Sequence, residues 1–184
     1  MIGAWIGLDA TAPTADASTL TPTAPDGPVI PPPEPSGIDQ LAFLVGGTWV
    51  GTSGGETLAQ ETCVWGTGQH SIRTTVVLGS GSEVTGQGHG RFNCSPTDQL
   101  LSHSNIESGG TDQRMYARQI PIAERVQGAL KQWHFEATYL TDAGVQHRQM
   151  VLLQLGPNEM RVNQSMLVSG KRVQVASVTY GRKS

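Results

Sequence analysis

The sequence lacks a long apolar run, an excess of basic residues and a cysteine framework, and each absence removes a class of protein. No stretch approaches the ~20 apolar residues of a membrane-spanning helix, so we expect no membrane span. Lysine and arginine number 12 against 15 acidic residues, and without a basic stripe we expect no nucleic-acid partner. Two cysteines do not make a disulfide scaffold, and we interpret Cys63 and Cys94 as small buried or half-buried side chains.

The N-terminus also lacks the pattern of a secretory signal. Met1–Leu8 is apolar, but no basic residues precede it and no convincing small-residue cleavage site follows it. We therefore expect a cytoplasmic protein.

Familiar catalytic and metal-binding motifs are missing as well. No Gly-x-Ser-x-Gly elbow occurs, and the five histidines fall on five separate predicted strands without metal-ligand spacing, so we expect no metal site. The run Gly86–Gly90 is rich in glycine, but it lacks the helix and the Lys-Ser/Thr pair of a phosphate loop. The sequence leaves open whether the protein is an enzyme and assigns no catalytic residue.

Two regions follow one another along the chain. Residues 1–37 form a region rich in Pro, Thr and Ala, with four acidic residues and no lysine or arginine. Eight of the eleven prolines lie here, which favours an extended arm that does not fold alone. Its apolar tip, Met1–Leu8, is either an anchor that docks on the barrel or on a protein partner, or an arbitrary N-terminus. Residues 38–184 form the predicted folded domain.

The folded domain begins with one or two predicted helical turns over residues 38–45 and continues as short strands. Glycine-rich turns such as Gly54-Gly55 and Ser169-Gly170 separate these strands. Ten strands in up-and-down order predict a single all-β antiparallel barrel, because closure removes exposed edges. The predicted strands cover approximately residues 48–53, 56–65, 70–78, 83–93, 99–107, 111–119, 129–140, 145–155, 159–168 and 171–180.

Alternation within the strands predicts which side chains face inward. Trp133, Phe135, Ala137 and Tyr139 share one face of their strand. One face of the 83–93 strand consists of glycines, which indicates either sharp coiling of the strand or close approach of a ring or ligand.

The segment Leu41–Gly51, which contains Gly47-Thr48-Trp49-Val50-Gly51, resembles the opening of lipocalin-like barrels. The Gly-x-Trp-x-Gly pattern is most similar to nitrobindin-like and uncharacterised bacterial lipocalin-like families. Glu61–Trp65 and the closing stretch Gly144–Arg182 agree with this resemblance. It implies that Trp49 seals one end of the barrel, with Arg182 stacked across it.

The resemblance also brings an expectation about haem. Nitrobindin-type barrels bind haem iron through a histidine near the C-terminal end, whereas this chain has no histidine after His147. We therefore expect no haem and no other cofactor.

The barrel predicts a cavity for a small ligand, with a few polar groups on apolar walls. An inward Glu61 would need a partner such as Arg73 or Arg148. The leading hypothesis is binding of a small apolar or amphipathic molecule. One alternative is an accessory subunit of a larger assembly, tethered through Met1–Gly37. Another is a cavity-shape enzyme, a cyclase or isomerase, with the arm as lid. The predicted ligand-binding residues are Glu61, Trp65, His103, Trp133, Gln164 and Met166.

Overall fold

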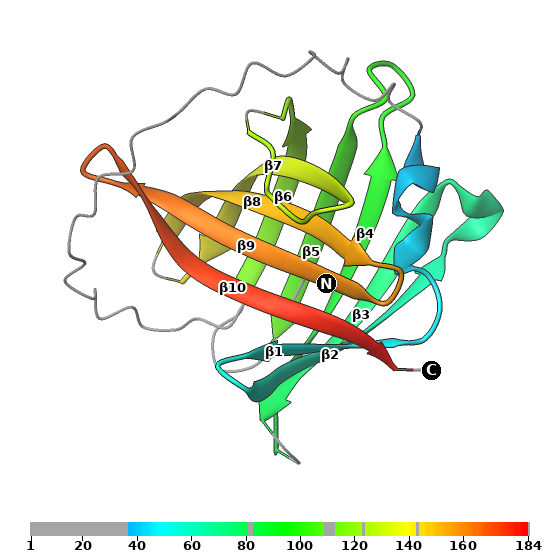
Figure 1. Ribbon diagram of the computed structural model, residues 1–184, viewed down its shortest axis with the longest axis horizontal. Coiled ribbons are helices and arrows are strands. Elements are labelled where there is room, and N and C mark those ends of the chain that lie inside the picture. Colours follow the sequence, from blue (N-terminus) through cyan, green and yellow to red (C-terminus); the bar gives the residue numbers. More distant parts are fainter. Residues whose placement is uncertain (1–36, 81–82, 109–112, 123, 143, 184) are drawn as a thin grey trace.

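Ten segments with alternating burial, joined by short turns, pair into a closed antiparallel barrel (Figure 1). The computed structural model describes residues 37–80, 83–108, 113–122, 124–142 and 144–183. A short 3₁₀ helix, η1 (Ile38–Leu44), precedes the barrel, and η2 (Thr67–Gln69) lies between the second and third strands. The strands are β1 (Thr48–Ser53), β2 (Glu56–Trp65), β3 (Ser71–Ser80), β4 (Glu83–Cys94), β5 (Leu101–Ser108), β6 (Gln113–Ile120), β7 (Lys131–Thr141), β8 (Gly144–Gly156), β9 (Glu159–Val168) and β10 (Lys171–Lys183).

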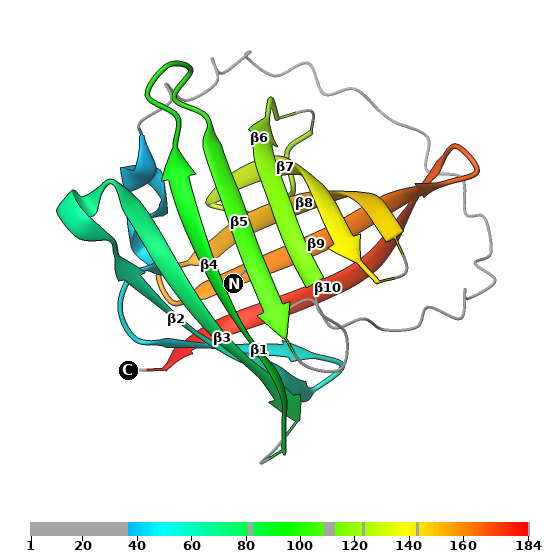
Figure 2. The same ribbon diagram turned by 180° about the vertical axis from the view of Figure 1, so that it is seen from behind.

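Each strand pairs with its neighbours in the chain, and β1 also pairs with β10, which closes the barrel. Figure 2 shows β3 to β6 as one wall, with β8 to β10 behind them. The predicted ten-strand barrel and its short N-terminal helix are therefore confirmed. The largest difference is at the end of β10, which continues to Lys183 because Thr48 of β1 pairs with that residue.

The interior follows the period-two alternation of the strands. On β7, the side chains of Trp133, Phe135, Ala137 and Tyr139 are all buried, as predicted. Cys63 is buried, Cys94 is half-buried and both are free thiols, which agrees with the interpretation from sequence. Apolar side chains from all ten strands form one continuous core together with three residues of η1.

Helix η1 closes one end of the barrel. Phe43 stacks on Trp133 of β7 and contacts the edge of Trp49 of β1, so the helix reaches two separate walls. The Trp49 indole Nε1 donates a hydrogen bond to the Leu44 carbonyl oxygen at 2.8 Å. The Arg182 guanidinium lies 4.5 Å from the centre of the Trp49 ring and also donates to the Phe43 carbonyl oxygen. The predicted Trp49–Arg182 stack is confirmed, and it fixes the helix to the barrel.

The expectations for the Pro-rich arm concern residues 1–37, and all but Gly37 lie outside the described residues. Within the described ranges, no helix has the length and apolar character needed to cross a membrane.

Candidate ligand-binding site in the barrel interior

A group of polar side chains lies inside the otherwise apolar barrel. Seven of them are at most 3% exposed, and the eighth is the half-buried Arg148. Burying polar groups costs free energy, so apolar packing alone does not account for eight polar side chains inside one barrel. We call this group the lumen polar cluster; it consists of Glu61, Thr74, His103, Asn105, Glu107, Tyr139, Arg148 and Gln164.

Strand β5 supplies three members of the cluster. His103, Asn105 and Glu107 are buried and follow the buried Leu101 at every second position. Because side chains alternate across a strand, all three point into the barrel. The Asn105 side-chain nitrogen donates a hydrogen bond to Glu107 Oε1 at 2.6 Å.

The glycine face of β4 makes room for these side chains. A Cβ atom on Gly90 would lie 2.6 Å from Thr74 Oγ1 and 2.9 Å from both Asn105 Oδ1 and His103 Nε2. Three polar atoms from β3 and β5 therefore converge over the space where Gly90 has no side chain. Of the two interpretations of the glycine pattern, close approach therefore applies at Gly90, and the groups that approach are side chains of the neighbouring strands.

Gln164 of β9 connects the other side of the cluster. Its side-chain nitrogen donates to the Tyr139 hydroxyl at 2.5 Å, and its Oε1 accepts from Arg148 at 2.8 Å. The Arg148 guanidinium also lies 4.7 Å from the centre of the Tyr139 ring and donates to Gln146 Oε1. This hydrogen-bonded chain fixes the side chains of three consecutive strands, β7 to β9.

Glu107 links the two sides electrostatically. Burial raises the pKa of Tyr139 well above its usual value, and the negative charge of Glu107 adds to this shift while Arg148 opposes it. Burial likewise raises the pKa of Tyr180 on β10, with Glu107 and Cys63 as smaller contributors. The Glu107 carboxylate of β5 is thus close enough to affect the hydroxyls of Tyr139 on β7 and Tyr180 on β10, since charge effects fall with distance. Because the pKa values of both tyrosines are raised, both hydroxyls stay protonated.

Within the cluster, His103 has hydrogen-bonding capacity that the described residues do not use, as does Arg148 through its Nε. Its ring stacks on Phe92 with centroids 4.1 Å apart, and burial holds its pKa well below the usual value, so the imidazole is neutral. Neither ring nitrogen has a hydrogen-bond partner among the described residues. A neutral imidazole has one donor and one acceptor nitrogen, so His103 offers both to a ligand.

Glu61 is buried beside Cys63, whose Sγ donates a weak hydrogen bond to Glu61 Oε1 at 3.7 Å. The expected pairing with Arg73 is wrong, because Arg73 points to the outer face of β3. The alternative partner, Arg148, instead donates to Gln164 and Gln146. Burial raises the pKa of the Cys63 thiol, which keeps it protonated as a donor.

The remaining predicted ligand residues lie outside the cluster. Trp133 is buried, but its indole Nε1 donates to Gln40 Oε1 of η1 at 2.7 Å, and its ring stacks on Phe43. Trp65 is half-buried against the apolar core. Met166 is half-buried and pairs with Val173 near the β9–β10 turn. Of the six predicted residues, Glu61, His103 and Gln164 are therefore among the buried polar side chains of the barrel interior.

The cluster members that sequence reasoning missed carry only weak signals. Asn105 and Glu107 continue the alternation that begins with Leu101 and His103, and this pattern was available in the sequence. The intervening residues of β5 include two serines, so polarity alone does not distinguish its two faces. Thr74 and Arg148 become cluster members only through strand register, which the sequence does not state.

Among the described residues, no three His, Cys, Asp or Glu side chains are grouped as a metal site would require. Searches of protein-family models and of curated proteins found no match for this chain.

Proposed function

We propose that the barrel binds a small amphipathic molecule, with the polar group of the ligand at the lumen polar cluster. The observation that carries this proposal is the buried His103, whose two nitrogens have no hydrogen-bond partner among the residues described. A buried imidazole nitrogen without a partner costs about 1–3 kcal/mol, a cost that a ligand group removes when it binds there.

The surroundings of the cluster support an amphipathic ligand. Apolar side chains such as Phe92, Met115, Phe135 and Met150 flank it inside the barrel. Small-molecule sites typically combine apolar walls with a few placed polar groups. Because the cluster contains both donors and acceptors, it matches a ligand with one compact polar end on an apolar body.

We further propose that this barrel is a lipocalin-like protein related to the nitrobindin-like families. Gly47-Thr48-Trp49 begins the first strand, and Arg182 stacks on Trp49 behind a short helix that closes the barrel. The two features agree with the resemblance noted in the sequence.

His103→Phe tests the binding proposal with little disturbance of packing. The new ring keeps the stack on Phe92, removes both ring nitrogens and breaks no hydrogen bond between described residues. We expect unchanged or greater thermal stability and about tenfold weaker binding of 1-aminoanthracene, a fluorescent apolar ring system with one amino group.

Gln87→Phe, at an exposed site on the outer face of β4, is the control and should leave probe affinity unchanged. Native mass spectrometry of the full chain, purified from its own cells, provides a second measurement. A discrete bound mass present in the wild-type protein and depleted in His103→Phe supports the proposal. Equal probe affinity and equal bound mass in the two proteins would contradict it.

A further inference from the structure

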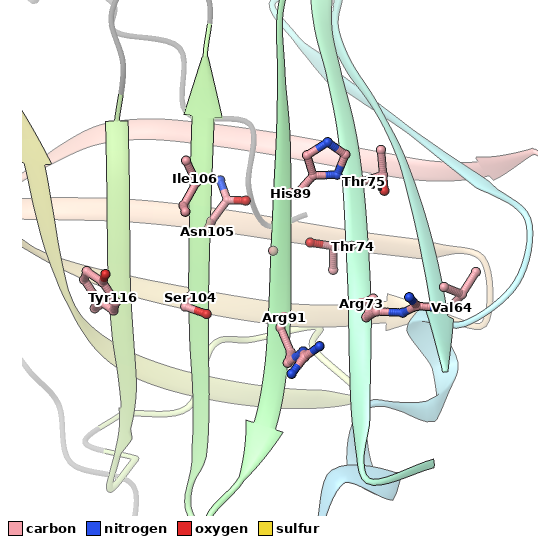
Figure 3. Close-up of a pocket in the computed structure, with 11 residues that line it drawn as sticks. Val64, Arg73, Thr74, Thr75, His89, Arg91, Ser104, Asn105, Ile106 and Tyr116 are labelled. Atoms are coloured by element: carbon pink, nitrogen blue, oxygen red, sulfur yellow. Dashed lines mark hydrogen bonds between the residues drawn. The ribbon is translucent and has the colours of Figure 1, made fainter. Parts of the chain in front are cut away.

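The outer face of β3 to β6 contains a hollow that the interior site does not use. It has a volume of about 560 Å³, within the range of small-molecule sites (Figure 3). The side chains of Thr74 and Asn105 point into the barrel and Gly90 has no side chain, so on the outer face these three residues form the floor of the hollow. We call it the outer hollow; the residues around the floor are Val64, Arg73, Thr75, His89, Arg91, Ser104, Ile106 and Tyr116.

Two arginines lie side by side in the outer hollow. Arg73 of β3 is directly opposite Arg91 of β4 in the strand register, and both side chains are exposed. Like charges directly opposite each other on paired strands destabilise a sheet. No carboxylate is among the described residues that line the hollow, whereas Arg118 on β6 is paired with Asp98 at 2.6 Å. A bound anion would convert this repulsion into two attractive contacts.

On the next two strands, the residues in register with the two arginines have hydroxyl groups. Ser104 of β5 is opposite Arg91, and Tyr116 of β6 is opposite Ser104. Guanidinium groups and hydroxyls both donate hydrogen bonds to phosphate and carboxylate oxygens. Four adjacent strands thus present one row of donors, which Figure 3 shows crossing the hollow from Arg73 to Tyr116.

Apolar surface borders this row of donors. Val64, Ile106 and Tyr116 are 48%, 58% and 54% exposed. Ile106 is two residues after Ser104 on the same face of β5, and Val64 of β2 is opposite Arg73 in the strand register. Exposed apolar groups around paired cations match a ligand with an oxyanion on a hydrophobic or aromatic body.

We propose that the outer hollow binds a small organic anion, a phosphate or carboxylate attached to an apolar group. The oxyanion accepts hydrogen bonds from Arg73 and Arg91, and the apolar group covers Ile106 and the Tyr116 ring. The charged and apolar side chains of the outer hollow point outward and alternate with the inward-facing side chains of the interior site, although Thr74 and Asn105 of the lumen polar cluster also form part of the floor.

Amide chemical shifts of the ¹⁵N-labelled full chain, recorded during titration, test the proposal. Phenyl phosphate and benzoate should shift amides at and around Arg73, Arg91 and Tyr116 and saturate. Inorganic phosphate should bind at least about tenfold more weakly, because it lacks the apolar group. The two organic ligands together show which oxyanion the site prefers.

Arg73→Gln and Arg91→Gln should each weaken phenyl phosphate binding by about tenfold or more, because each removes a charge-assisted hydrogen-bond donor. Arg172→Gln, at an exposed position on β10, is the matched control and should bind like the wild-type chain. Both test variants should fold, since removing one of two opposed like charges relieves repulsion.

Three results would overturn the proposal. The first is the absence of saturable shifts in this region. The second is equal affinity of the Arg73→Gln and Arg172→Gln variants. The third is inorganic phosphate binding as tightly as phenyl phosphate, which would leave a bare anion site and no role for the apolar surface.

Discussion

Gly90→Ala is the most direct test of the packing described for the barrel interior. The added Cβ would lie 2.6 Å from Thr74 Oγ1, whereas ordinary contact begins at 3.4 Å, so the two atoms must separate by about 0.8 Å. Asn105 is held by its hydrogen bond to Glu107, and His103 is held by its stack on Phe92. Little relief is available, and overpacking of this kind costs about 1–3 kcal/mol.

The gain from replacing glycine by alanine in a strand, about 0.5–1 kcal/mol, offsets part of this cost. We expect a net loss of about 1–2 kcal/mol, which lowers the Tm by roughly 2–8 °C for a domain of this size. Urea unfolding followed by circular dichroism measures the change.

Gly181→Ala on β10 is the control for this experiment. No heavy atom of the described residues lies within 4 Å of a Cβ placed on Gly181, so that variant should be as stable as the wild type or slightly more stable. Equal stability of the two alanine variants would refute the claim that three polar side chains converge over Gly90.

Three further predictions follow from individual contacts. Arg182→Ala should lower the free energy of unfolding by about 1–3 kcal/mol in urea titrations, because it removes the stack on Trp49 and the hydrogen bond to Phe43, and Arg182→Lys should lose less. The pKa of His103 is lowered in the folded state, so unfolding takes up a proton below about pH 6.5, and stability should fall with decreasing pH by up to about 1.4 kcal/mol per pH unit. His103→Phe should reduce the dependence of stability on pH. The dependence that is left comes from His134, because burial lowers its pKa as well. An unchanged pH dependence in His103→Phe would contradict the lowered pKa of His103. Burial raises the pKa of both thiols, so their difference in exposure decides their reactivity: the half-buried Cys94 should react with a thiol reagent in the native protein, while the buried Cys63 reacts only on unfolding, as peptide mass spectrometry of labelled protein would show.

Much of the barrel was predictable because its strands are regular and its turns contain glycine. Alternation on β7 and the Gly54-Gly55 turn identify strands and their ends from local sequence alone. Trp49 and Arg182 were predictable as a pair only through the resemblance to lipocalin-like barrels. The exact ends of β10 were less predictable, since Lys183 is in a strand only because Thr48, far away in the sequence, pairs with it.

The lumen polar cluster was predictable in part. Local alternation shows which side chains of a strand point inward, but it does not show which of them lie close together. His103 and Gln164 each follow an apolar residue on the same face of their strand, which the sequence shows. Their partners depend on register: Gln164 meets Tyr139 across the intervening strand β8, and nothing near either residue indicates this. The opposition of Arg73 and Arg91 similarly depends on the exact register between β3 and β4.

Strand β4 explains how one wall can carry two different sites. Its inward positions include Gly88 and Gly90, which leave space for side chains of β3 and β5 to lean over it inside the barrel. Its outward positions include His89 and Arg91, which line the outer hollow. A larger residue at an inward position would push the neighbouring side chains apart and disperse the cluster, whereas the outer face would keep its arginines. The side chains of the two sites point to opposite faces of this wall, and although Gly90 also forms part of the floor of the outer hollow, this separation allows mutations to test the two sites independently.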